Sequence, residues 1–194
     1  MASPEDEHVQ ITKDGVIDTI YNGIPDWVYE EEILSSNKAM YFSPGGSRMA
    51  FVQFNDTEVE EFFYTNYGDP SDPLAHQYPE QVMLKYPKVG TTNPTVKLFV
   101  NNLNQNNLPV IPPREVLDYD EHIVTAATWI SEDELSVIWS NRVQNESRFV
   151  ICCNERCHLT HWSRNYFQRI QMCPRKPRMA MHHSGSTHAS QRLA

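Results

Sequence analysis

Short apolar runs that end at turn residues constrain the fold of this chain more than any other feature. The runs are rich in Val, Ile, Phe, Tyr and Trp, as β-strands are, and Pro, Gly, Asn, Asp and Ser separate them. No segment longer than ten residues keeps the 3.6-residue period of an amphipathic helix. The predicted strands lie at residues 41–43, 49–54, 82–85, 96–101, 123–130, 135–139 and 149–152.

The runs also follow a repeated plan. Residues 39–47 read as an apolar strand leading into a turn, and residues 128–139 repeat this plan about ninety positions later. The segment Ser-Pro-Gly-Gly-Ser at 43–47 is interpreted as a hairpin turn and not as a phosphate-binding loop. Recurring meanders predict an all-β fold, in which a β-propeller and a β-sandwich both remain open.

Size and composition suit one soluble domain. The chain has 194 residues, 40% of them hydrophobic, and 13 prolines. No apolar run approaches the roughly 18–20 residues that span a membrane. The N-terminus is acidic and polar, which is unlike a secretory signal, so residues 1–8 are expected to form a polar extension.

The net charge of −9 conceals a division of the chain. Residues 1–157 hold all 25 acids against 10 Lys and Arg, a balance of −15, whereas residues 158–194 hold six basic residues and no acid. The acidic part argues against a nucleic-acid partner. We expect a domain boundary near residue 157, followed by a basic, His-rich, disordered tail with the character of an alternative exon or a frameshift.

An acidic cluster stands at residues 26–32, Asp-Trp-Val-Tyr-Glu-Glu-Glu. On an extended strand Glu30 and Glu32 would share one face and Glu31 the other, so the three can converge only if the strand breaks into a turn or short helix. Trp27 and Tyr29 are candidates to anchor such a turn. Two interpretations follow from the residues: a solvated acidic surface, or a site for a cation such as a free ammonium.

The cysteines are also open to two interpretations. Cys152, Cys153 and Cys157 could supply a small hairpin disulfide. Zinc is the alternative, since His158 and His161 follow, but the run lacks the usual second separated pair of ligands, so no metal is predicted. The fourth cysteine, at position 173, is expected to be left over, either as a free thiol or as part of an unrelated tail.

Two N-glycosylation acceptors agree with an extracellular chain, Asn55 in Asn-Asp-Thr and Asn145 in Asn-Glu-Ser. No Gly-x-Ser-x-Gly elbow, Gly-rich phosphate loop or His-Glu-x-x-His sequence is present, so no catalytic residue and no cofactor is predicted.

The acidic cluster and the residues before it, 20–32, resemble the double-glutamate motif of the dipeptidyl peptidase IV family. Further matches follow in family order over about residues 9–157. They are Tyr-Phe-Ser-Pro at 41–44, Gln-Phe-Asn-Asp-Thr-Glu-Val at 53–59, Tyr-Pro-Lys-Val-Gly at 86–90, Asn-Pro-Thr-Val-Lys at 93–97 and Trp-Ser-Asn-Arg-Val-Gln-Asn at 139–145.

The resemblance implies a fold and a site. In that family an eight-bladed propeller caps an α/β-hydrolase domain, so residues 9–157 would form a partial β-propeller of about three blades in an open ring. It also implies that Glu31 and Glu32 bind the N-terminal ammonium of a peptide and set the dipeptide register. Glu30, Trp27 and Tyr29 would support them.

The family's catalytic Ser, Asp and His have no counterparts in this sequence, and neither has its upstream arginine. The resemblance implies a parent serine exopeptidase that releases X-Pro or X-Ala dipeptides, on the cell surface or secreted. Its expected partners are the peptide N-terminus, the parent's hydrolase domain and, in the complete protein, a second copy. The alternative is an inactive relative that acts as an ion-channel auxiliary subunit, since such relatives keep the motif.

Overall fold

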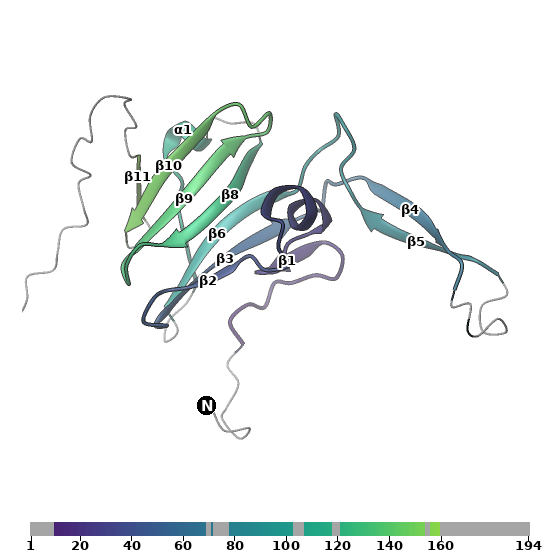
Figure 1. The fold of residues 1–194 in the computed structure, drawn as a ribbon, viewed down its shortest axis with the longest axis horizontal. Helices are drawn as coiled ribbons and strands as arrows, with labels where there is room; N and C mark the ends of the chain where they lie inside the picture. Colours follow the sequence, from purple (N-terminus) through teal and green to yellow (C-terminus); the bar gives the residue numbers. More distant parts are fainter. Residues whose placement is uncertain are drawn as a thin grey trace, which may run out of the picture.

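The computed structural model describes residues 10–68, 71, 78–102, 107–117, 121–153 and 156–159. Strands dominate these residues, and all paired strands of the three sheets are antiparallel (Figure 1). The all-β prediction is therefore confirmed. The predicted extension at residues 1–8 and the predicted tail from residue 160 onward lie outside the described residues.

The first sheet is built around β3 (Arg48–Asn55). On one side β3 pairs with β6 (Thr95–Asn102), which in turn pairs with β7 (Asn107–Pro109). On its other side β3 pairs with two short strands, β1 (Ile20–Asn22) along one half and β2 (Met40–Phe42) along the other. One strand position of this sheet is thus filled by two half-strands, and the chain between them leaves the sheet.

The second sheet is a simple meander of β8 (His122–Trp129), β9 (Glu134–Asn141), β10 (Ser147–Cys153) and β11 (Arg156–Leu159). A one-turn helix, α1 (Arg114–Leu117), precedes it and buries Val116. Strand β11 extends across the domain boundary expected near residue 157, so the strand pairing continues to Leu159.

A hairpin is inserted in the chain between β3 and β6, which pair directly with each other. It consists of β4 (Glu61–Asn66) and β5 (Glu80–Lys85) and projects away from the two sheets (Figure 1). The strand predicted at 82–85 lies within β5, but β4 was not predicted. Every residue of β4 except Thr65 is exposed, so this strand lacks the alternation that reveals a half-buried one.

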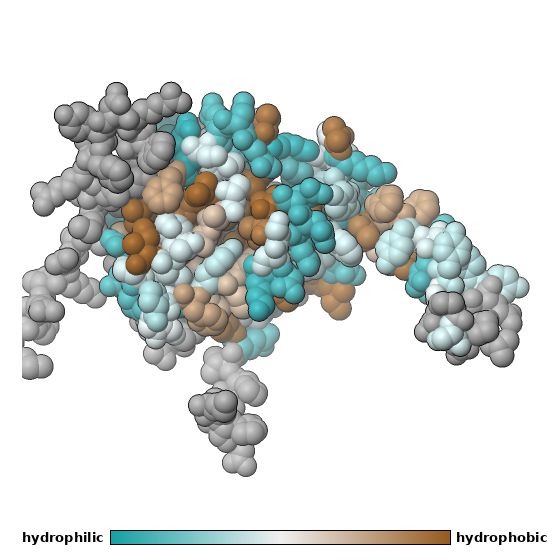
Figure 2. Space-filling view, in the orientation of Figure 1, coloured by the Kyte–Doolittle hydropathy of each residue, from teal (hydrophilic) through white to brown (hydrophobic). Residues whose placement is uncertain are grey.

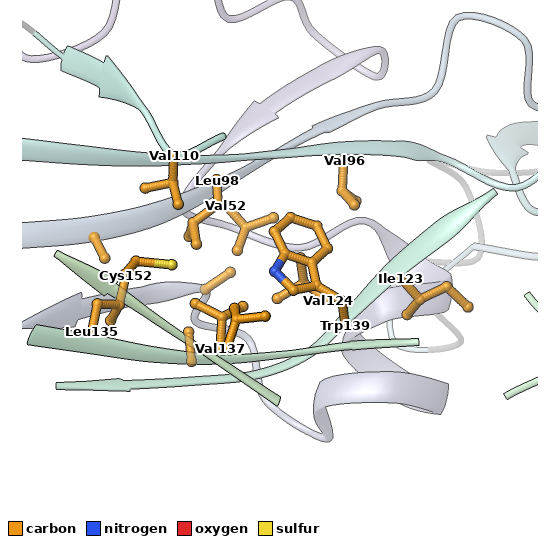
Figure 3. Packing of buried hydrophobic residues seen from close by; sticks show 14 of the residues in the cluster. Val52, Val96, Leu98, Val110, Ile123, Val124, Leu135, Val137, Trp139 and Cys152 are labelled. Carbon is orange, nitrogen blue, oxygen red and sulfur yellow. The ribbon is translucent and has the colours of Figure 1, made fainter. Parts of the chain in front are cut away.

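The core lies between the facing sides of the two sheets (Figure 3). Val52 and Leu98 on the first sheet face Leu135, Val137 and Trp139 on the second, and each of these side chains is at most 1% exposed. Burying an aliphatic side chain of this size contributes about 1.5–3 kcal/mol. The apolar runs read from the sequence therefore stabilise the packing of one sheet against the other.

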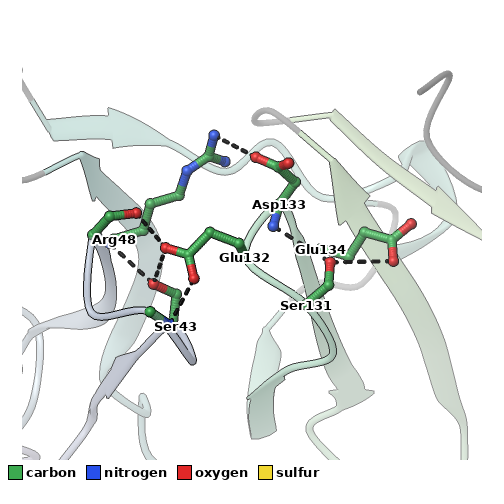
Figure 4. Close-up of polar contacts among 8 residues, drawn as sticks. Ser43, Arg48, Ser131, Glu132, Asp133 and Glu134 are labelled. Carbon is green, nitrogen blue, oxygen red and sulfur yellow. Dashed lines mark hydrogen bonds and ion pairs between the residues drawn. The ribbon is translucent and has the colours of Figure 1, made fainter. Parts of the chain in front are cut away.

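Polar contacts join the sheets at the hairpin turn between β2 and β3 (Figure 4). Glu132, in the turn between β8 and β9, accepts hydrogen bonds from Ser43 Oγ at 2.7 Å, from the Gly45 backbone N–H at 2.7 Å and from Ser47 Oγ. These donors lower the pKa of Glu132 to about 2. Arg48 and Asp133 form an ion pair 2.6 Å long beside it. Residues 43–47 thus form the hairpin turn predicted from the sequence, and that turn binds the second sheet.

No helix among the described residues is long and apolar enough to cross a membrane.

Candidate functional site

The acidic cluster lies on the excursion between the half-strands β1 and β2. Backbone hydrogen bonds close the base of this excursion: Gly23 N–H donates to the carbonyl of Val52 at 2.8 Å, and Ala39 N–H donates to the carbonyl of Gly23 at 2.9 Å. Gly23 adopts φ +73°, and a Cβ there would meet Met40 Cε at 3.1 Å, which explains the glycine. The chain therefore leaves and rejoins the sheet at nearly the same point.

Within the excursion, residues Tyr29–Leu34 form a short π-helix, η1. Asp26 begins it: its Oδ2 accepts from the Val28 backbone N–H at 3.1 Å, and its carbonyl accepts from Glu30 N–H at 2.9 Å. Ser35 ends it in the left-handed conformation, φ 48°. A short helix thus replaces an extended strand here, as convergence of the glutamates requires. It is a π-helix, a type that often occurs at functional sites.

One aromatic side chain anchors η1 and the other does not. Tyr29 is 1% exposed, and its ring lies 4.7 Å from that of Phe54 on β3. Ile33 and Leu34 pack against the same core. Trp27, by contrast, is 53% exposed. Of the two anchors expected from the sequence, Tyr29 alone is buried.

The three glutamates differ in exposure. Glu30 is half-buried, whereas Glu31 and Glu32 are exposed. Tyr86, which follows β5, donates a hydrogen bond from its hydroxyl to Glu32 Oε1 at 3.3 Å. Within the described part of the chain none of the three forms an ion pair. Figure 2 shows hydrophilic residues over the region of η1, next to more hydrophobic ones toward the hairpin. Neighbouring carboxylates without a cation repel one another, so this surface favours a positively charged ligand.

Two buried carboxyl groups lie at this segment, Asp26 within it and Asp56 close to it, and the sequence did not indicate the burial of either. Asp26 is 3% exposed and Asp56, just after β3, is 1% exposed. Burial raises the pKa of Asp26 to about 6, and burial together with the charge of Asp26 raises the pKa of Asp56 to about 7. Lys85 opposes that rise, and its ammonium donates to the carbonyl of Asp56 at 2.7 Å. No local pattern marks these residues, since their burial is created by β1, β3 and η1.

The structure joins Cys152 to Cys157 by a disulfide across the paired strands β10 and β11. Cys153 is disulfide-bonded as well. His161 and the cysteine at position 173 lie outside the described residues. Among the residues that the structure does describe, no group of three His, Cys, Asp or Glu side chains is placed to hold a metal ion.

The two glycosylation candidates occupy different settings. Asn55 ends β3 and is half-buried, and its Oδ1 accepts from the backbone N–H of Thr57 at 3.0 Å and from the Thr57 hydroxyl at 2.5 Å. Asn145 is exposed in the turn between β9 and β10, and its Oδ1 accepts from Asn141 Nδ2 at 2.8 Å. Asn145 is therefore the more accessible of the two.

Known proteins share the fold of this chain. The family model described as the dipeptidyl peptidase IV (DPP IV) N-terminal region matches residues 2–176. The crystal structure of Porphyromonas gingivalis dipeptidyl peptidase 4 superimposes with a TM-score of 0.67 and 31% identity, and the match covers 78% of this chain and 20% of that one. This similarity confirms the partial β-propeller.

Relatives agree with this assignment. Dipeptidyl peptidase 4 of Bos taurus is 42% identical over 160 residues, which cover 79% of this chain and 20% of that protein. Venom dipeptidyl peptidase 4 of Apis mellifera is 44% identical over 145 residues, 73% of this chain and 18% of that protein. The chain spans about a fifth of the length of these relatives. It belongs to the dipeptidyl peptidase IV family and corresponds to the family's N-terminal region.

Proposed function

We propose that Glu31 and Glu32 bind the free N-terminal ammonium of a peptide, as part of a dipeptidyl peptidase that releases X-Pro or X-Ala dipeptides. One observation carries this proposal: two adjacent, exposed carboxylates lie on a short helix whose base is fixed to the sheet, and no cation of the described chain is paired with them. Carboxylates make strong charge-assisted hydrogen bonds to an ammonium.

The neighbouring residues have supporting roles in this proposal. Glu30 is half-buried and adds negative charge beside the pair. Tyr29 holds η1 against the core, and Tyr86 orients the Glu32 carboxylate. An anchored ammonium fixes the distance from the peptide's end to the bond that is cut, so binding energy at Glu31 and Glu32 serves positioning.

The chemistry of cleavage belongs to another part of the complete protein. This chain contains no Gly-x-Ser-x-Gly elbow. The relatives are about five times longer than the segment they share with it. We therefore propose that a hydrolase domain supplies the nucleophile, and that the partial propeller supplies the amine-binding residues.

Substitution of Glu31 in the complete protein tests the proposal. Glu31→Gln should raise KM and lower kcat/KM for Gly-Pro substrates about 10- to 100-fold, since a hydrogen bond to a charged group is worth roughly 1.5–3 kcal/mol. Glu30→Gln is the matched control on the same helix and should change kcat/KM far less. Unchanged kinetics in the Glu31→Gln enzyme would remove the proposed role.

The auxiliary-subunit alternative makes a different prediction for the same complete protein. It requires a substituted nucleophile and therefore no turnover, even with Glu31 and Glu32 intact. The named relatives are peptidases by their descriptions, which favours the enzyme. Sequencing the complete transcript separates the two, because it shows whether the Gly-x-Ser-x-Gly serine is present.

A further inference from the structure

Asp26 and Asp56, called here the carboxyl pair, lie beside η1 and have no part in the proposed amine site. Asp26 begins the helix, since its Oδ2 accepts from the Val28 N–H at 3.1 Å and its carbonyl accepts from the Glu30 N–H at 2.9 Å. Asp56 follows β3 and is close enough for the charge of Asp26 to raise its pKa. The helix that carries the glutamates therefore begins at one member of the pair.

The carboxyl pair is buried and short of partners. Asp26 is 3% exposed and Asp56 1%, and Oδ1 of Asp26 and both carboxyl oxygens of Asp56 accept no hydrogen bond within the described residues. The ammonium of Lys85 donates to the backbone carbonyls of Asp56 and Thr57, at 2.7 and 3.3 Å, and forms no ion pair with either carboxyl. Two buried carboxylates without a cation are costly, so the pair is able to hold a proton near neutral pH.

The other ionisable groups around the carboxyl pair come from several elements. Tyr21 on β1 and Tyr29 on η1 stay uncharged near neutral pH, because burial, and then nearby carboxylates, raise the pKa of both. Asp18, before β1, and Glu121, before β8, add negative charge that acts on these tyrosines. Lys85, at the end of β5, is the cation that lowers the pKa of Asp56. Acids thus outnumber cations around the pair, and a further cation nearby would favour its ionised form.

Tyr86 shows that the amine site is within electrostatic reach of the carboxyl pair. Its hydroxyl donates to Glu32 Oε1 at 3.3 Å. Partial burial, and then the charges of Glu32, Glu31 and Asp26, raise the pKa of this hydroxyl. The charge of Asp26 therefore acts at a point in direct contact with Glu32, and an ammonium bound by the glutamates would lie close to that point.

We propose that binding of a peptide ammonium at Glu31 and Glu32 releases one proton from the carboxyl pair into water. The O–H bond of the carboxyl breaks, its electrons remain on oxygen, and the new carboxylate adds a negative charge that attracts the ammonium. The inference rests on the proposed amine-binding function and adds a dependence on pH. Because a proton is released on binding, the affinity for the ammonium should rise with pH.

The titration midpoints of the carboxyl pair test the proposal directly. They are measured by NMR of the chain labelled with ¹³C in its Asp carboxyl groups, and the signals are assigned by their loss in Asp26→Asn and Asp56→Asn. Saturating Gly-Pro-amide should lower a midpoint of the pair by about half a pH unit or more. N-acetyl-Gly-Pro-amide, which has no ammonium, should leave both midpoints unchanged.

Affinity measured by calorimetry gives the reciprocal test. Between pH 5.5 and 7, where the α-amino group of the ligand stays largely protonated, Gly-Pro-amide should bind about twofold or more tightly at the higher pH. The double variant Asp26→Asn/Asp56→Asn keeps an oxygen for the Val28 N–H and should bind equally at both pH values. Asp18→Asn removes an exposed acid outside the pair and should retain the rise. A rise that persists in the double variant would assign it to other groups and overturn the inference.

The outcomes separate the two proposals. If N-acetylation weakens binding and Gly-Pro-amide moves neither midpoint, the proton release is overturned and the amine site is retained. Equal binding of the free and the acetylated dipeptide amide would contradict the amine site and the proton release together. No binding of either ligand would overturn the inference, and the kinetics of Glu31→Gln would then decide the amine site alone.

Discussion

At the scale of single residues, Asp26 and Asp56 are the two described acids whose pKa values are clearly raised, and the sequence did not indicate that either is buried. Burial is the main cause in both, and Asp56 also feels the charge of Asp26. Within the described residues, neither oxygen of the Asp56 carboxyl nor Oδ1 of Asp26 has a hydrogen-bond partner. Their surroundings disfavour the ionised form, so each carboxyl keeps its proton to a higher pH than an exposed aspartate does.

The first prediction concerns pH. A carboxyl whose folded pKa lies above its unfolded value binds more protons when folded, so the free energy of unfolding should fall as pH rises from about 4 to about 7. Asp56→Asn removes one such group and should stabilise the chain at pH 7.5 by on the order of 1–3 kcal/mol. Urea denaturation at pH 4.5 and 7.5 measures both effects.

Asp18→Asn is the control, because Asp18 is exposed and its φ of 54° suits asparagine equally well. It should change the free energy of unfolding by less than about 0.5 kcal/mol. A stability that rises with pH in the Asp56-containing chain, relative to Asp56→Asn, would contradict the buried, protonated state.

At the scale of elements, η1 depends on one buried ring. Its six residues are too few to form a stable helix in isolation. The ring of Tyr29 packs on Phe54, and its buried hydroxyl lies beside the backbone of Val124, with no well-formed hydrogen bond among the described residues. The contribution of this side chain therefore comes mainly from its ring.

Two substitutions at position 29 separate these contributions. Tyr29→Ala should destabilise the chain by about 3–5 kcal/mol, as deletion of a buried aromatic ring does. Tyr29→Phe should change the free energy of unfolding by less than about 1 kcal/mol, since the hydroxyl has only the Val124 backbone beside it. Denaturation midpoints measure both, and a large destabilisation by Tyr29→Phe would show that the hydroxyl has a partner in solution.

The strands differ in how well the sequence predicts them. Strands with a buried face, such as β3 and β9, were predicted because their sequences carry the apolar runs of a core. Strand β4 was missed because nearly all of its residues are exposed and pairing with β5 alone defines it. The split into β1 and β2 was also missed, because it depends on how each half pairs with β3.

At the scale of the whole molecule, two sheets share one core and are joined at one edge by Glu132. The glutamate excursion and the hairpin both extend from the first sheet, and the contact of Tyr86 with Glu32 brings them together. The proposed amine-binding surface lies between these two extensions, while no nucleophile motif lies in the sequence.

A prediction for the whole molecule follows from the proposal that this chain binds the peptide while a hydrolase domain supplies the nucleophile. The purified chain should hydrolyse no Gly-Pro reporter substrate, because positioning without a nucleophile does not break a bond. A fluorogenic Gly-Pro assay measures this, with dipeptidyl peptidase 4 of Sus scrofa, a 43% identical relative, as the positive control. Turnover by the chain that survives further purification would contradict the proposed division.

The sequence by itself determined the all-β class, the Ser43–Ser47 turn and the family, because strand alternation, turn chemistry and motif order are local properties of a chain. Only the tertiary structure decided that the glutamates lie on a π-helix, that Tyr29 and not Trp27 is buried, and that Asp56 resists ionisation. Each of these depends on contacts between residues far apart in sequence. Tyr86 and Glu32 are 54 positions apart, and no local pattern indicates that they meet.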